Sequence, residues 1–302
     1  MDGWGVSGVE ESKPRRYLFY LGCLIPHRVM SYEVSARKVA ERLNIELVEM
    51  PEFCCCGLPV DHVNHKLMLL LAAQNLCTAE QLELPIMTLC SGCYGVLNKV
   101  NRMLKEDKDL REEMNVHLKK LGMSFKGTTD VKHLIQVLAE DIGLDVLRGL
   151  IRRPLKGWVV AEHYGCHVLR PSKYNDFDDP EDPKMLKRLI EVTGARCVDY
   201  VDETECCGFP VAGIDEGVVL QLVRDKLSHV REAGAQALVT ICPSCFLAYD
   251  INQSRIKRIM GEDYDIPIIH YSELLALALG VNPKSLLLNE HRVKLDALIE
   301  NL

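Results

Sequence analysis

The sequence predicts an α/β protein with two pseudo-symmetric domains, each built on a parallel sheet, that are related by internal duplication. Short apolar runs alternate with amphipathic helical stretches, and the same order of elements occurs twice. A five-cysteine pattern accompanies each copy: Cys23, Cys55, Cys56, Cys90 and Cys93, then Cys166, Cys206, Cys207, Cys242 and Cys245. Cys206 lies 151 positions after Cys55, and Cys242 lies 152 positions after Cys90, so the halves run nearly in step.

The first domain is expected over residues 15–105, after an N-terminal tail at 1–14 that lacks hydrophobic periodicity. Its strands are short apolar runs, and its helices repeat apolar residues every three to four positions. The expected strands are 15–22, 45–50 and 85–89, and the expected helices are 31–43, 61–82 and 90–105. In such an alternating order the cysteine-bearing loops should lie at the carboxyl ends of the strands.

Residues 106–156 are charged and free of cysteine, and they are expected to form a helical bridge. The second domain, 157–280, repeats the order of the first. Its expected strands are 157–161, 196–201, 236–241 and 266–270, and its expected helices are 183–193, 216–233 and 242–260. The spacing of apolar residues near the end predicts a C-terminal amphipathic helix within 281–302.

Composition limits the class of protein. At 302 residues and 48% hydrophobic, the chain is long enough for two cored domains. A formal net charge of −7 argues against nucleic acid or an anionic membrane as partner. No apolar run reaches the roughly 18–20 residues of a membrane span, and residues 1–13 do not resemble a signal peptide. We therefore expect a cytoplasmic protein, where thirteen cysteines favour metal binding over disulfides.

The number of cysteines in each set bears on the kind of metal centre. A Cys-x-x-Cys at a helix start places two sulfurs on one centre, with helix amides nearby that favour thiolate. A structural zinc site and a cubane cluster each take four ligands, which would leave one cysteine of every set unused. The repeated surplus favours a larger or less regular iron–sulfur cluster. Zinc and a thioredoxin-type redox pair stay open as alternatives, and no motif for a flavin or nucleotide is present.

The sequence contexts of the cysteines resemble a known family. Residues 21–28 (LGCLIPHR), 163–172 (HYGCHVLRPS) and 241–245 (ICPSC) are similar to the cysteine-rich (CCG) domain family, and to heterodisulfide reductase B subunits within it. The resemblance covers about 17–280. It implies two CCG domains, each binding a non-cubane [4Fe-4S] cluster through all five of its cysteines, with the two clusters facing each other across a cavity. It also implies an oxidoreductase that transfers electrons to a disulfide of the coenzyme M–coenzyme B type.

The resemblance further implies partner subunits, namely a ferredoxin-like C subunit and a flavin-containing A subunit. The loops after the two cysteine pairs, 57–60 and 209–213, depart from the methanogen pattern. We therefore keep other disulfides or thiols as substrates, as in Hdr-like B subunits of sulfur-oxidising complexes. A non-catalytic electron-relay subunit and a zinc-stabilised scaffold are the remaining alternatives.

Three residues are candidates for substrate binding: Arg28, His167 and Phe209. Arg28 follows Cys23 by five positions and could hold an anionic group, although a water-exposed arginine explains it equally well. His163 and His167 flank Cys166 and could donate to a cluster sulfur or a leaving thiolate. Phe209 opens the loop that departs from the pattern. The three cysteines outside the repeat are expected to be buried apolar thiols: Cys54, Cys77 and Cys197.

Overall fold

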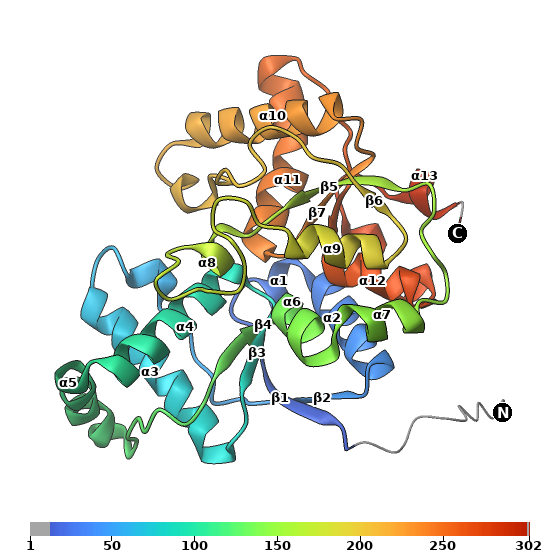
Figure 1. Ribbon diagram of the computed structural model, residues 1–302. Helices are drawn as coiled ribbons and strands as arrows, with labels where there is room; N and C mark the ends of the chain where they lie inside the picture. The colour runs from blue at the N-terminus through green and yellow to red at the C-terminus, as the bar shows by residue number, and fades with distance from the viewer. Residues whose placement is uncertain (1–12, 301) are drawn as a thin grey trace.

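The computed structural model describes residues 13–300 and 302, and it contains two α/β units that each enclose a four-stranded parallel sheet (Figure 1). Most of the expected tail, residues 1–12, lies outside the described part of the chain. The strand order is β2-β1-β3-β4 in the first sheet and β6-β5-β7-β8 in the second. The predicted α/β class and its duplicated parallel sheet are confirmed.

The first sheet consists of β1 (Arg15–Tyr20), β2 (Ile45–Val48), β3 (Ile86–Thr88) and β4 (Val131–His133). β1 lies in the centre, with Tyr17 opposite Leu47 of β2 and Leu18 opposite Ile86 of β3. Its last four residues are buried, as expected for a strand covered on both faces. The helices of this unit are α1 (Ile25–Arg28), α2 (Met30–Arg42), α3 (His65–Leu82), α4 (Ser91–Glu106) and α5 (Lys108–Leu118).

The expected helical bridge at 106–156 contains a strand. β4 pairs with β3, and Thr88 lies opposite His133, so this segment completes the first sheet. β4 is only three residues long, which is too short for an alternating pattern to stand out from its surroundings. It is followed by α6 (Leu134–Gln136), a π-helical turn (Val137–Ile142) and α7 (Leu144–Leu150), which then lead to the second unit.

The second sheet consists of β5 (Val159–His163), β6 (Arg196–Cys197), β7 (Ala237–Thr240) and β8 (Ile268–His270). Its helices are α8 (Cys166–Leu169), α9 (Met185–Val192), α10 (Glu216–Glu232), α11 (Pro243–Met260) and α12 (Tyr271–Ala278). Equivalent helices in the two units begin in the same way. Asn64 caps α3 by accepting from the Leu67 amide, and Asp215 caps α10 by accepting from the Val218 amide.

The C-terminal segment forms a short helix, α13 (Asp296–Ile299), where the spacing of apolar residues predicts one, and its Leu298 is buried. Two single 3-10 turns precede it after Gly280. Pro283 starts the first turn, and Leu287 has a positive φ of 55° before the second, so no continuous helix can run through this stretch. Among the helices of residues 13–300 and 302, none combines the length and hydrophobicity that a membrane crossing requires.

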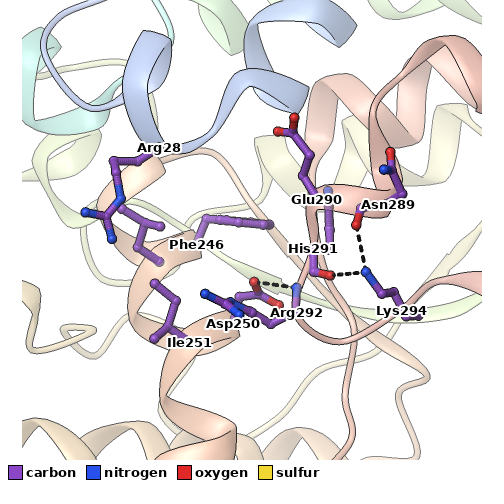
Figure 2. A pocket seen from close by; sticks show the side chains of 10 residues that line it. Arg28, Phe246, Asp250, Ile251, Asn289, Glu290, His291, Arg292 and Lys294 are labelled. Carbon is purple, nitrogen blue, oxygen red and sulfur yellow. Dashed lines mark hydrogen bonds between the residues drawn. The ribbon is translucent and has the colours of Figure 1, made fainter.

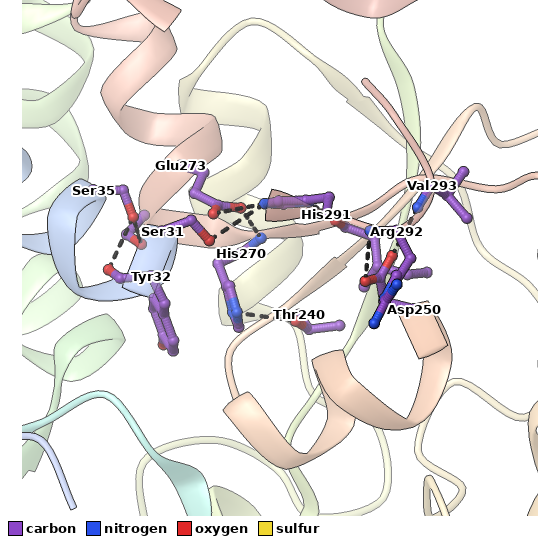
Figure 3. A network of polar contacts seen from close by, with 12 residues as sticks. Ser31, Tyr32, Ser35, Thr240, Asp250, His270, Glu273, His291, Arg292 and Val293 are labelled. Atoms are coloured by element: carbon purple, nitrogen blue, oxygen red, sulfur yellow. Dashed lines mark hydrogen bonds and ion pairs between the residues drawn. The ribbon is translucent and has the colours of Figure 1, made fainter. Parts of the chain in front are cut away.

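The two units interlock through α2 of the first and α12 of the second, which lie side by side in Figure 1. Ser35 Oγ lies 2.7 Å from Ser272 Oγ in this contact. A buried polar network continues from it, in which Ser31 Oγ, His291 Nε2 and Glu273 Oε1 lie near one another (Figure 3). The seam between the units is therefore fixed by specific polar contacts as well as apolar packing.

Candidate metal centres

Each sheet carries its cysteines at the point where the strand order reverses. The chain leaves β1 toward β2 on one side and returns to β3 on the other, so the carboxyl ends of β1 and β3 border a crevice. Cys23 follows β1 and Cys90 follows β3. In the second sheet Cys166 follows β5 and Cys242 follows β7 in the same way. The cysteine-bearing loops therefore lie at the carboxyl ends of the strands, as expected.

One cavity of about 440 Å³ lies between the two units at these strand ends. Nine of the ten repeated cysteines line it: Cys23, Cys56, Cys90, Cys93, Cys166, Cys206, Cys207, Cys242 and Cys245. The tenth, Cys55, is exposed and directly precedes Cys56. The remaining wall is largely apolar and includes Leu58, Pro59, Phe209 and Pro210 from the two loops that follow the cysteine pairs. The fold thus gathers both sets of thiols around one space.

Within the first set, neighbouring thiols interact directly. Hydrogen bonds from Cys55 and Cys93 lower the pKa of Cys56 to about 3. Hydrogen bonds with Cys56 and Cys90, together with burial, raise the pKa of Cys93, because they favour its protonated form. Cys90 begins α4 as its N-cap residue, and it also contacts Cys242 of the second set. Four of the five thiols therefore form one connected group.

The second set is connected in the same manner. Hydrogen bonds from Cys166 and Cys207 lower the pKa of Cys206 to about 2. Hydrogen bonds from Cys245 and Cys90, together with the backbone amides of Cys245 and Ser244 at the start of α11, lower the pKa of Cys242 well below its usual value. Neighbouring thiols and burial instead raise the pKa of Cys166, Cys207 and Cys245. Thiolate is the form that binds metal, so binding of a cationic centre would release the protons of these thiols.

The donor chemistry fits a sulfur-ligated polynuclear metal centre. Soft thiolates in mutual contact around one cavity are the ligands that iron–sulfur clusters use. One nitrogen joins them, because His163, Cys207 and Cys245 place their ligand atoms within 4.8 Å of one another. Burial lowers the pKa of His163 to about 3, so its ring is neutral. The sequence places His163 near Cys166 only, since its approach to Cys207 and Cys245 depends on how the loop after β6 and the start of α11 pack.

One glycine makes the sharp turn after each cysteine pair. Gly57 has φ of 95° and Gly208 has φ of 75°, which is the left-handed region that glycine adopts without strain. A Cβ on Gly57 would lie 2.9 Å from the Cα of Met68, so the turn is also closely packed. The cysteine pairs are held against α3 and α10 by this geometry.

The structure separates the three candidate substrate residues. Phe209 and His167 both line the cysteine cavity, and His167 Nδ1 lies 3.3 Å from Cys166 Sγ. Arg28 instead lines a second cavity of about 490 Å³, with Phe246, Arg292 and Lys294 among its other walls (Figure 2). Leu24, at the start of the short helix α1, lines the cysteine cavity, whereas Arg28 at the end of that helix does not. Arg28 is therefore not placed with the other two.

The three cysteines outside the repeat are not part of the cavity wall. Cys77 and Cys197 are buried, as expected. Cys54 is partly buried, and its Sγ lies 3.6 Å from the Cys55 carbonyl and 3.8 Å from the Leu71 carbonyl. Its thiol therefore contacts the backbone of its own loop and of α3.

Comparison with known proteins agrees with this arrangement. The model of the cysteine-rich (CCG) domain matches residues 17–98 and 160–250, one match in each unit. The chain is 36% identical over 280 residues to the B subunit of the ferredoxin:CoB-CoM heterodisulfide reductase of Methanosarcina mazei, covering 91% of this chain and 93% of that protein. It is 31% identical over 278 residues to the 8-methylmenaquinol:fumarate reductase membrane anchor subunit of Wolinella succinogenes, covering 92% and 96%.

A solved structure shares the fold. The crystal structure of a hypothetical protein from Helicobacter pylori superposes with a TM-score of 0.76 at 16% identity, covering 94% of this chain and 53% of that one. This likeness concerns the fold alone. With both units matched by the domain model and full-length relatives above 30% identity, the chain belongs to the cysteine-rich (CCG) domain family, and its relatives include heterodisulfide reductase B subunits.

Proposed function

We propose that this chain is the catalytic B subunit of a heterodisulfide reductase-type complex, which acts on a disulfide or a related thiol at two iron–sulfur centres. The observation that carries the proposal is the gathering of nine repeated cysteines from both units around one 440 Å³ cavity. The similarity to the M. mazei protein over nearly the whole chain supports the reaction class. Partners of the C type, ferredoxin-like, and of the A type, flavin-containing, would then connect it to an electron donor.

The two sets of five cysteines are the proposed ligands, each for one non-cubane [4Fe-4S] cluster. Two adjacent thiols such as Cys206 and Cys207 can reach different metal atoms of one irregular centre. When bound, such clusters would supply single electrons and iron sites that accept a sulfur ligand. Reduction of one disulfide consumes two electrons and two protons and yields two thiols, so one centre for each sulfur matches the stoichiometry.

The chain's own side chains would orient the substrate and provide protons. Leu58, Pro59, Phe209 and Pro210 form an apolar part of the cavity wall, against which the substituents of a substrate would pack. His167 places a ring nitrogen beside Cys166, where it can deliver a proton to a departing thiolate. His62 lines the cavity from the other unit and is positioned for the second proton. Phe209 would set which substituent fits beside the disulfide.

A second possible function, that of a non-catalytic electron-relay subunit, also has support. The similarity to a subunit of the W. succinogenes menaquinol:fumarate reductase extends over 96% of that protein. An electron-relay subunit would need the metal centres but no substrate between them. Disulfide reduction therefore requires that the cavity bind a substrate, whereas electron relay does not.

The deciding experiment is anaerobic purification of the chain with its partners, followed by metal, acid-labile sulfide and paramagnetic resonance measurements. We expect iron and sulfide in both units and a new resonance signal with one thiol, tested with coenzyme M, coenzyme B and simple thiols. A signal that no thiol changes favours the relay function. Zinc in place of iron and sulfide refutes both functions.

Paired cysteine variants test the ligand assignment. Cys207→Ala should lose the iron of the second unit, because it removes a thiol of the cavity. Cys54→Ala should retain all of the iron, since the Cys54 thiol contacts the backbone carbonyls of Cys55 and Leu71 and does not line the cavity. Iron per chain, measured by mass spectrometry of the metal, checks both. Loss of iron from Cys54→Ala would show that the ligands of the first unit are wrongly assigned.

A further inference from the structure

Two carbonyl groups that come from different units share the same pair of hydrogen-bond donors. They belong to Leu89 and Ile241, which directly precede Cys90 and Cys242. Tyr32 Oη lies 2.8 Å from the Leu89 oxygen and 3.1 Å from the Ile241 oxygen. His133 Nε2 lies 3.0 Å and 3.1 Å from the same two oxygens. Two donors and two acceptors thus meet at the seam between the units.

The protons needed for this arrangement can be counted. The Leu89 and Ile241 oxygens only accept, so both Tyr32 and His133 must donate. His133 Nδ1 accepts from the backbone amide of Ile135 at 3.4 Å, which leaves the ring proton on Nε2, toward the carbonyls. Each donor has one hydrogen and each carbonyl oxygen has two lone pairs, so both donors can be satisfied here. All four groups are buried, where an unmade hydrogen bond is costly.

The surroundings hold this contact in one position. The Tyr32 ring stacks on His270 of the second unit, with centroids 3.7 Å apart and planes within 7° (Figure 3). Ser91 Oγ of the first unit also lies 3.4 Å from the Ile241 oxygen. Gly165 approaches Ser91 so closely that an added Cβ would lie 2.0 Å from that Oγ. The first Cys-x-x-Cys segment, which contains Ser91, is therefore packed closely against the second unit.

From this contact we infer that Tyr32 and His133 are positioning residues that set the distance and orientation between the two metal centres. Both come from the first unit, yet each reaches a carbonyl of the second. They hold the residues just before Cys90 and Cys242, and so fix one Cys-x-x-Cys segment relative to the other. This inference depends on the proposed function, because it requires a metal centre in each unit.

The test is Tyr32→Phe in the anaerobically purified complex. This change removes one hydroxyl and keeps the ring that stacks on His270. Tyr271→Phe is the matched control, because Tyr271 is equally buried and its hydroxyl donates to one carbonyl, Leu189 O at 3.0 Å, away from the cysteines. His133→Leu removes the other donor, and His133→Gln, whose side-chain amide can donate in place of Nε2, tests rescue.

Three measurements separate the outcomes: iron per chain, the spin–spin splitting between the two centres, and their reduction potentials. We expect Tyr32→Phe and His133→Leu to keep wild-type iron but to change the splitting and shift at least one potential. Tyr271→Phe should change neither, and His133→Gln should restore most of the wild-type signal. Wild-type splitting and potentials in both Tyr32→Phe and His133→Leu would overturn the inference alone. Absence of iron from the wild-type complex would overturn the proposed function and the inference together.

Discussion

The buried ion pair between Glu273 and His291 should contribute strongly to the stability of the seam between the units. Neither side chain is exposed to solvent. Glu273 Oε1 lies 3.0 Å from His291 Nε2, and His291 Nδ1 lies 2.8 Å from the Ile268 oxygen (Figure 3). A doubly protonated ring satisfies both acceptors. The other Glu273 oxygen accepts from the His270 amide at the start of α12.

Removing one partner leaves a charge in the core without its counterpart. His291→Leu would leave the Glu273 carboxylate unpaired and the Ile268 carbonyl without a donor. Loss of one member of a buried pair costs about 3–5 kcal/mol, a large share of the roughly 5–15 kcal/mol that a folded domain has. The double variant Glu273→Leu/His291→Leu should lose less than the sum of the single variants, because no charge remains buried alone.

Urea unfolding of the four proteins, followed by circular dichroism, gives the coupling free energy. The expected coupling is favourable by about 2 kcal/mol or more, within the range measured for groups in contact. A cost below about 1 kcal/mol for His291→Leu would refute the idea that a buried charge is left behind, since that is the cost of an ordinary exposed pair.

The pH dependence of the same cycle follows from the two pKa values. Burial alone would lower the pKa of His291, but Glu273 raises it above 6.5. Burial alone would raise the pKa of Glu273, but His291 lowers it below 4.5. Protonated His291 contributes fully to the free energy of unfolding below pH 6.5, and this contribution is lost as pH rises through its folded pKa. Ionised Glu273 contributes fully above pH 4.5, and its contribution is lost as pH falls through its folded pKa. The difference between wild type and His291→Leu should therefore be largest between these values, and a flat difference across and beyond this range would contradict the pairing.

Two predictions concern glycines beside the cysteines. Gly165→Ala should destabilise the chain by about 1–3 kcal/mol in thermal unfolding, because its Cβ would lie 2.0 Å from Ser91 Oγ. Adding Ser91→Gly should restore most of the lost stability, and absence of this rescue would show that the clash is with another group. Gly208→Ala should cost about 1–2 kcal/mol because φ is 75°, whereas Gly213→Ala in the same loop, with open space around its Cβ, should be nearly neutral. Equal losses in these two variants would show that φ does not determine the cost.

The sequence predicts the strands that carry the cysteines better than it predicts the edge of the first sheet. β1 and β7 are buried apolar runs, so their positions follow from hydrophobicity alone. β8 is likewise expected because it is apolar. Its counterpart β4 has only Val131, Lys132 and His133, and its lysine is partly exposed. Such a short edge strand owes its formation to pairing with β3, which no local pattern reveals.

Some residues of the candidate site can likewise be identified from the sequence, and others cannot. Spacing alone identifies the ten cysteines as two repeated sets, and nine of them line the cavity at the strand ends. Arg28 shows that closeness in sequence does not ensure a shared site, since it lies five residues after Cys23 and yet lines another cavity. Tyr32 and His133 could not be identified from sequence, because their partners are backbone carbonyls that any residue type provides.

The two units repeat the spacing of the cysteines closely, but the histidines around them differ in their contacts and positions. His133 and His270 occupy the same place, each capping a helix after the last strand of its sheet. His133 bonds to both seam carbonyls, whereas His270 stacks between Tyr32 and Phe246 and its Nε2 has no hydrogen-bond partner within the described residues. Around the cavity, the first unit supplies His62 from the loop after its cysteine pair, and the second supplies His167 from beside Cys166. If the proposed function holds, two centres with unlike surroundings would treat the two sulfurs of a disulfide differently, and the site would then favour an unsymmetrical disulfide.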